Sequence, residues 1–290
     1  MFARLTPEHK RRLIDALRRN GAYVAVIGDG VNDVPAMKGA RLAVALGSGT
    51  QLAKSVADAV LVSDRFGAIP DAVAEGRRII GNVQRVAKLF VTKSVFAAFV
   101  IATFGLWTGE FPLLPRHLSL AATFTVGVPG FVLALGPDSG VPETGGFVRR
   151  VLRFALPAGA VMGAATLIAY LAVGDVRGHS DSEARTAAVT VYVAIGLYLL
   201  LVLDAERMQR SRRYAALIVA LAASLGAGYL VVLGTPALRE FFALTIPGFW
   251  AVLVMVACGV GAVWALSRLG LSPYRGSSLP EPASTADRST

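Results

Sequence analysis

The stretch GDGVNDVPAMK, from Gly28 to Lys38, decides how the first part of the chain is interpreted. It places two aspartates, an asparagine and two glycines directly after the apolar run AYVAVI and before a stretch that can form a helix. A strand ending at Gly28 would carry Asp29 to the carboxyl edge of a parallel sheet, where open α/β folds hold their ligands. The stretch therefore predicts a strand, a ligand-binding turn and a helix.

The residue types of this turn suit a hard cation. Gly28 and Gly30 permit a tight turn, and Asn32 and Asp33 stand at the start of the next helix, where the positive end of the helix dipole can face an anion. Asp29 and Asp33 would repel each other unless a positive group lay between them. Mg²⁺ prefers one or two carboxylates together with phosphate oxygens and water. The spacing alone is equally compatible with an Asx-rich turn that caps a helix.

The sequence around this turn, up to residue 82, alternates short apolar runs with amphipathic stretches. KRRLIDALRRNG predicts a helix ended by Gly21, and YVAVIG predicts a buried parallel strand. RLAVALG and AVLVS predict further short strands. Residues 1–82 are therefore expected to form a compact α/β domain.

The remainder of the chain is expected to lie in a membrane. Of the 290 residues 54% are apolar, and the mean hydropathy is +0.59. Six apolar segments are each close to the roughly 20 residues that span about 30 Å of hydrocarbon. They cover residues 86–107, 117–136, 151–173, 186–203, 214–234 and 245–267. We therefore expect a six-helix membrane domain over residues 83–268, followed by a polar, Pro- and Ser-rich, disordered cytoplasmic tail over residues 269–290.

Basic residues set the expected orientation. The second and fourth connections between these segments carry the arginine clusters, whereas the first, third and fifth carry few basic residues. The positive-inside rule then predicts a multi-pass protein of the cell membrane with both termini cytoplasmic. This topology accounts for most of the net charge of +10, and no aromatic residues interleave with the arginines, so nucleic acid is not an expected partner. The single cysteine, Cys258, excludes a disulfide framework.

Three stretches of the first hundred residues together resemble P-type cation-transporting ATPases. They are FARLTPEHKRRLIDAL, VIGDGVNDVPAMKGARLAVALGSGTQLAKSVADAVLV and AVAEGRRIIGNVQRVAKLF. They match the C-terminal half of the phosphorylation domain, which has a haloacid-dehalogenase-like fold, and the stalk that follows it. The resemblance thus implies a partial haloacid-dehalogenase-like Rossmannoid α/β domain followed by an all-α polytopic bundle of six membrane helices.

The resemblance also implies roles for individual residues of the turn. Lys10 matches the lysine that contacts the transferred phosphoryl group, and Asp29 matches the Mg²⁺ ligand. Asn32 and Asp33 match residues that support the phosphate and the metal. Ile27 departs from the family, which usually has threonine there. Mg²⁺ and ATP are the cofactors implied.

Several parts of the family pattern do not occur in this sequence. The family nucleophile is the aspartate of a D-K-T-G-T motif, which forms an aspartyl phosphate, and no such motif is present. The nucleotide-binding domain, the actuator loop and the first four membrane helices are also missing. We therefore expect a C-terminal portion of a pump that is inactive alone and that would need a separate N-terminal half. The alternatives are an inactive truncated remnant and a non-catalytic membrane partner of a split pump.

The resemblance implies that the transport site involves the first two apolar segments, and the second carries most of the candidates. TFTVGVPGF places Gly127 and Pro129 in the middle of the segment, where they can interrupt the helix and free carbonyl groups for a cation, and Thr123 and Thr125 could add hydroxyl oxygens. A kinked helix with a packing role is an equal alternative. Lys93, in the first segment, is a further candidate that could instead snorkel to the membrane surface.

The resemblance implies transport of a cation, Ca²⁺ or another metal ion. Calcium pumps usually carry carboxylates where this chain has Ala97 and Val126, and this departure counts against calcium specificity. Asp204 and Glu206 follow the fourth apolar segment and are expected to pair with nearby arginines.

Overall fold

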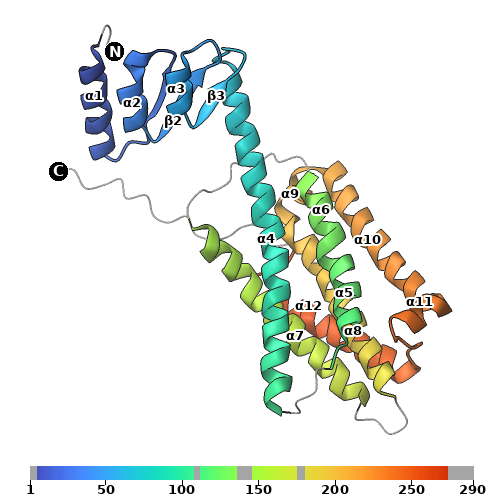
Figure 1. The fold of residues 1–290 in the computed structure, drawn as a ribbon. Coiled ribbons are helices and arrows are strands. Elements are labelled where there is room, and N and C mark those ends of the chain that lie inside the picture. The colour runs from blue at the N-terminus through green and yellow to red at the C-terminus, as the bar shows by residue number, and fades with distance from the viewer. Residues whose placement is uncertain (1–4, 108–111, 136–145, 175–179, 274–290) are drawn as a thin grey trace. The chain divides into compact units, whose positions relative to one another are not determined.

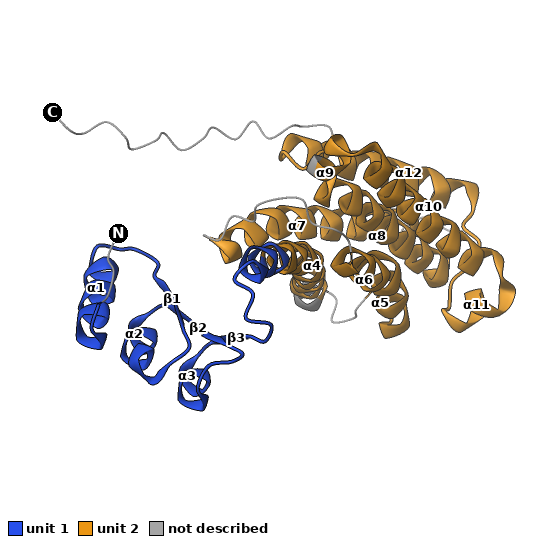
Figure 2. Cartoon of the chain, turned by 90° about the horizontal axis from the view of Figure 1, so that it is seen from above, with its two compact units in different colours: residues 1–76 blue, residues 77–290 orange. Residues whose placement is uncertain are grey.

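The computed structural model describes residues 5–107, 112–135, 146–174 and 180–273 (Figure 1). The chain divides into two compact units, Met1–Gly76 and Arg77–Thr290 (Figure 2). Helix α4 (Ala68–Trp107) runs through this division, so the domain boundary that we expected near residue 82 lies inside a helix.

Unit 1 contains a three-stranded parallel sheet in the order β1-β2-β3. The elements that make up this unit are α1 (Pro7–Arg19), β1 (Ala25–Gly28), the 3-10 turn Val31–Asp33, α2 (Val34–Gly39), β2 (Leu42–Leu46), α3 (Gln51–Val56) and β3 (Ala59–Leu61). Helices α2 and α3 each connect one strand to the next, and the strand order β1-β2-β3 proceeds across the sheet in one direction. Right-handed crossovers place such helices on the same face of the sheet, as Figure 2 shows. The α/β prediction is confirmed.

The core of unit 1 lies between this face and the helices. Met37 on α2 and Ala53 on α3 are buried against Ala43 and Ala45 of β2. On the other face, Ile27 of β1 is paired in register with Val44 and is 36% exposed. The described residues of unit 1 therefore cover one face of the sheet better than the other.

Among its described residues, unit 2 contains six helices, or helix runs, long and apolar enough to cross a membrane, as the sequence predicts. They are α4; α5 (Pro115–Ala122), continued by a π-helical segment (Thr123–Gly127) and α6 (Val128–Leu135); α7 (Phe147–Gly174); α8 (Asp181–Leu203); α10 (Arg212–Gly234); and α12 (Phe249–Arg268). The short helices α9 (Ala205–Arg210) and α11 (Pro236–Phe241) lie in connections. The prediction of a disordered tail falls on residues 269–290, of which 274–290 lie outside the described residues.

Small residues allow the membrane helices to approach one another closely. A Cβ atom added at Gly159 of α7 would lie 2.6 Å from the Cβ of Val95 on α4, and one added at Gly163 would lie 2.5 Å from the Phe99 ring. Close backbone approach is the usual role of glycine between membrane helices. The packing of α7 on α4 therefore depends on these two glycines.

Candidate functional site

The turn after β1 is built around a buried glycine. A Cβ added at Gly28 would lie 2.6 Å from the Cβ of Asp33 and 2.9 Å from the sulfur of Met37. A larger residue at position 28 would therefore push Asp33 and α2 away from the end of the strand. Gly30 has a β-region backbone conformation directly before the 3-10 turn Val31–Asp33.

Lys10 and Asp33 form the ion pair of this site. Lys10 Nζ, from α1, donates to Asp33 Oδ1 at 2.7 Å, and both side chains are partly exposed. The Asp33 carboxylate also accepts from the backbone N–H groups of Asp29 and Gly30. It makes no capping hydrogen bond to α2. The carboxylate thus turns back toward the end of β1, which differs from the capped helix start that the spacing equally allowed.

The electrostatics of Asp33 favour its charged form. Burial raises the pKa of this carboxyl, but the hydrogen bond and charge of Lys10, with the two backbone donors, outweigh burial and hold the pKa below its usual value of 3.8. Because the folded pKa is lowered, these interactions stabilise the fold above pH 3.8 and are lost as the pH falls through the lowered value.

Asp29 lies at the mouth of the turn. Its side chain is exposed, and no described residue forms a hydrogen bond or an ion pair with its carboxylate. Its carbonyl accepts the N–H of Thr50 at 2.8 Å, which ties the turn after β1 to the turn after β2. A Cβ added at Gly49 would lie 2.9 Å from the same carbonyl oxygen. Sequence reasoning missed Gly49 and Thr50, although the run GSGT after a predicted strand is typical of a tight turn.

The donor set of the turn suits Mg²⁺. Within the described residues no three His, Cys, Asp or Glu side chains gather to form a protein-only metal cage. One free carboxylate, Asp29, lies beside a second one, Asp33, that is already held by a lysine. Mg²⁺ takes one or two carboxylates and completes its shell with water and phosphate oxygens, so these residues fit it. Asn32 is exposed next to them.

The second apolar segment is not interrupted between Gly127 and Pro129. The backbone N–H of Val128 bonds to the carbonyl of Thr123, five residues earlier, so residues 123–127 form a π-helical turn. The helix continues as α6, and Pro129, which has no N–H, lies just beyond the turn. The segment is therefore a continuous helix with a π-helical turn, and not the interrupted helix that was one of the two alternatives; such π-bulges occur frequently at functional sites.

The transport-site candidates of this segment lie on two faces. Thr125 is buried, donates to the carbonyl of Ala121 at 2.8 Å and is hydrogen-bonded to Tyr192 of α8. Pro129 is buried as well. In contrast, Thr123 and Gly127 are exposed on the outer surface of the segment. The structure therefore does not bring the four candidates together.

Lys93 is half-buried on α4, and it forms no hydrogen bond or ion pair with any described residue. The two positions at which the resemblance leads one to expect carboxylates carry apolar side chains packed in the bundle: Ala97 lies against the main core, and Val126 is buried.

A buried polar cluster in unit 2 was not identified from the sequence. Arg85 of α4 donates to Asp204 Oδ1 at 3.2 Å and to the Asn82 side chain. Tyr214 of α10 donates to Asp204 Oδ2 at 3.0 Å, and Asn82 donates to the carbonyl of Ala134 at 2.8 Å. Four segments of unit 2 therefore meet at one charged pair, with both Arg85 and Asp204 buried.

The partner of Asp204 comes from a distant part of the sequence. We expected a nearby arginine, but Arg85 lies 119 positions earlier. The only signal in the sequence was an arginine placed just before the first apolar segment, where a snorkelling role is the ordinary interpretation. The Glu206 side chain lies outside what the structure describes.

Comparison with known protein families gives a match within each of the two units. The family described as "Cation transporting ATPase, C-terminus" matches residues 110–269, and the haloacid dehalogenase-like hydrolase family matches residues 10–73. The calcium-transporting ATPase CtpE of Mycobacterium bovis is 38% identical over 293 residues, covering 94% of this chain and 36% of that protein. A calcium-transporting ATPase of Bacillus subtilis is 31% identical over 277 residues, covering 91% of this chain and 31% of that protein.

An Arabidopsis thaliana protein, the endoplasmic reticulum-type calcium-transporting ATPase 3, is 44% identical over 132 residues, which cover 44% of this chain and 13% of that protein. The chain thus spans about a third of the length of the two bacterial relatives. The match of a membrane-domain family to more than half of the chain, with the six helices and the parallel sheet, establishes the family. This chain belongs to the P-type cation-transporting ATPases and corresponds to a C-terminal part of them.

Proposed function

We propose that this chain supplies the metal- and phosphate-contacting turn and the ion-pathway helices of an ATP-driven cation pump. The phosphorylated aspartate and the main ATP-binding domain would come from residues outside this sequence. The observation that carries the proposal is the Lys10–Asp33 contact of 2.7 Å beside the free carboxylate of Asp29. A cation, a carboxylate pair and a glycine turn form the set of groups that phosphoryl transfer requires.

Each residue of the turn has a distinct role in this proposal. Asp29 would hold Mg²⁺, with Asp33 in support, and the bound ion would neutralise charge on the nucleophile and on the phosphoryl group. Lys10 would present its ammonium group to the phosphoryl oxygens, and Asp33 fixes its position. Asn32 would donate to the phosphate. Gly28 and Gly30 allow the turn to reach the ligand without obstruction by a side chain.

The transported ion is proposed to be Ca²⁺, since the bacterial relatives are named calcium-transporting ATPases. Without carboxylates at positions 97 and 126, its ligands would be neutral oxygens. The buried hydroxyl of Thr125, and the carbonyls next to the π-helical turn and Pro129, are the favoured donors. Thr123 and Gly127 lie on the outer face and would contribute through the backbone of the turn. Lys93 would affect the dependence on ion concentration rather than phosphorylation.

The arrangement in the cell follows from the same proposal. Residues 1–82 would form the C-terminal half of a phosphorylation domain, and residues 83–268 would form the membrane domain, with residues 269–290 as a cytoplasmic tail. Both termini would be cytoplasmic. The incompletely covered face of the sheet, which includes Ile27, would be completed by the N-terminal half of the pump, whether on the same or a separate polypeptide.

Phosphoenzyme formation tests this proposal. The chain would be fused to, or co-expressed with, the preceding part of a bacterial relative, and acid-stable label from radioactive ATP would be measured at matched membrane levels. We expect Asp29→Asn to remove most of the label and to reduce it more than Asp33→Asn does, because a neutral amide is a poor substitute for a direct carboxylate ligand. Asp71→Asn, at an exposed position on α4, is the matched control. Full phosphorylation of Asp29→Asn would refute the metal-ligand assignment.

A further inference from the structure

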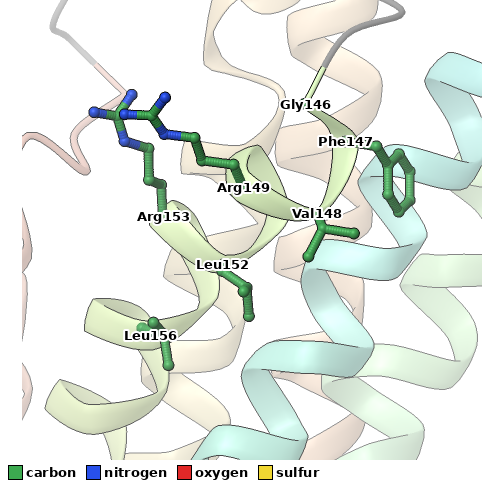
Figure 3. A pocket seen from close by; sticks show the side chains of 7 residues that line it. All are labelled: Gly146, Phe147, Val148, Arg149, Leu152, Arg153 and Leu156. Atoms are coloured by element: carbon green, nitrogen blue, oxygen red, sulfur yellow. The ribbon is translucent and has the colours of Figure 1, made fainter.

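A groove of about 640 Å³ lies along the first turns of α7 and has not been assigned a role above. Arg149 and Arg153 border the groove. Figure 3 shows that these two side chains project in the same direction from the helix. The apolar side of the groove is formed by Val148, Leu152 and Leu156. The lining of the groove is thus almost entirely apolar, and the two guanidinium groups lie beside it.

The two arginines lie four positions apart, so they are neighbours on the surface of the helix. Like charges at this spacing destabilise a helix unless a counter-charge lies between them. No described residue forms an ion pair or a hydrogen bond with either guanidinium group. Two parallel guanidinium forks are well matched to the oxygens of a phosphate. The guanidinium pair beside the groove is therefore complementary to a phosphate group.

The apolar side of the groove faces away from the protein core. Val148, Leu152 and Leu156 recur every four residues and are 65%, 38% and 52% exposed. They belong to the first turns of a helix that is apolar enough to span a membrane, so acyl chains are their natural surroundings. A free phosphate in water would gain nothing from this apolar side. An arginine pair suited to a phosphate lies beside an apolar stripe suited to an acyl chain. This combination favours a phospholipid as the ligand.

We propose that this groove binds one anionic phospholipid, with Arg149 and Arg153 on its phosphate and an acyl chain along Leu152 and Leu156. The six spans cross the membrane in succession, so the start of α7 lies on the same side as the start of α4. The lipid would therefore belong to the leaflet in which the first span begins, which is cytoplasmic in the expected topology. Basic pockets at this depth are typical sites for anionic headgroups. The proposal does not depend on pump activity.

Lipid retention by the full chain in nanodiscs tests this site. The nanodiscs would contain phosphatidylcholine with a minor fraction of phosphatidylglycerol, and native mass spectrometry would count the lipids that stay bound. We expect retained phosphatidylglycerol in preference to phosphatidylcholine, and we expect Arg149→Gln/Arg153→Gln to weaken that preference by about tenfold or more, as two basic contacts are removed. Added inorganic phosphate should not displace the lipid.

The matched control removes the same charge elsewhere on the same side of the membrane. Arg212→Gln/Arg213→Gln, at the start of α10, changes two adjacent arginines that do not face each other on the helix, and it should retain the preference. Leu152→Trp keeps both arginines and fills the apolar side, so it should also lose the bound lipid, even if the double arginine variant fails to fold. Equal loss in the Arg212/Arg213 variant, displacement by phosphate, unchanged retention in Leu152→Trp, or no preference in the unsubstituted chain would overturn the proposal.

Discussion

Lys10 is the one positive side chain that the described residues bring to the Asp33 carboxylate, and it comes from a different element of unit 1. Without its partner the lysine would resemble its neighbours in the basic stretch Lys10–Arg12. Its contact with Asp33 fixes the ammonium group beside the turn, where a phosphoryl group would be held. The role of Lys10 can therefore be separated from that of general surface charge.

We expect Lys10→Ala to slow phosphoenzyme formation in the completed pump by a barrier of about 2–4 kcal/mol, as for other groups that stabilise a transition-state charge. Arg11→Ala is the matched control, because Arg11 lies in the same helix and forms only a 3.9 Å surface pair with Asp15. The measurement is the initial rate of acid-stable labelling. Equal rates in the two variants would show that the lysine contributes only to the overall charge of α1.

Glycines at helix contacts show how single residues determine the packing of elements. Gly159 of α7 lies so close to α4 that an added Cβ would meet Val95 at 2.6 Å and the carbonyl of Thr92 at 2.8 Å. Gly259 of α12 has no atom within 4 Å of an added Cβ. Both glycines are within helices, where alanine is intrinsically favoured by about 1 kcal/mol. Because their surroundings differ, substitution by alanine should have opposite effects on stability at the two glycines.

We expect Gly159→Ala to lower the free energy of unfolding by about 1–3 kcal/mol, the usual cost of overpacking, and Gly259→Ala to leave it unchanged or slightly higher. Thermal unfolding of the purified chain in detergent provides the measurement. An equal upward shift of the melting temperature in both variants would mean that α4 and α7 do not pack closely in solution.

The Arg85–Asp204 pair connects elements that are remote in the sequence. Removing one partner of a buried ion pair leaves an uncompensated charge, which costs about 3–5 kcal/mol, whereas replacing both with apolar residues of similar size is often neutral. We therefore expect Arg85→Ala to destabilise the bundle strongly and Arg85→Met/Asp204→Leu to recover most of the loss. The melting temperature and the yield of monodisperse protein would report both effects. A double variant no more stable than Arg85→Ala would show that the pair contributes by specific hydrogen bonding.

Long elements were predictable from the sequence, and junctions between them were not. The six spans follow from apolar length alone, because each must cross the hydrocarbon, and the strands around the turn follow from short apolar runs. Helix α4, however, begins at Ala68, well before its apolar part, because an amphipathic stretch continues into the span without a break. The π-helical turn was not predictable because its i→i+5 bonding depends on packing, with Thr125 buried beside Gly196 of α8.

In the candidate site, too, some features were predictable from the sequence and others were not. Asp29, Asn32 and Asp33 lie within five positions of one another, so one turn places them together whatever the rest of the fold does. The position of Lys10 beside Asp33 depends on how α1 packs in unit 1, and only the resemblance to a family pointed to it. The Arg85–Asp204 pair depends on contacts across 119 positions, and the one signal in the sequence, an arginine just before the first apolar segment, did not point to its partner. Local chemistry was therefore predictable, and long-range pairing was not.

At the scale of the whole molecule, the membrane topology determines how the site and the lipid groove can be reached. Six successive spans place the start and the end of the bundle on the same side of the membrane. The arginine-rich connections then favour the cytoplasm for that side, since basic residues are retained there during insertion. Ser211, before α10, should consequently be cytoplasmic, and Ala237, in α11 after that span, should be external.

Cysteine labelling in intact cells would check this topology in a Cys258→Ala background, which removes the only native thiol. We expect a membrane-impermeant maleimide to label Ala237→Cys from outside and Ser211→Cys only after permeabilisation. Both positions are exposed outside the apolar part of the spans, so differences in labelling report the side of the membrane and not burial. The reverse pattern would place unit 1 outside the cell, away from ATP and Mg²⁺. That result would contradict the orientation and also the proposed role of the turn in phosphoryl transfer, because both depend on a cytoplasmic unit 1.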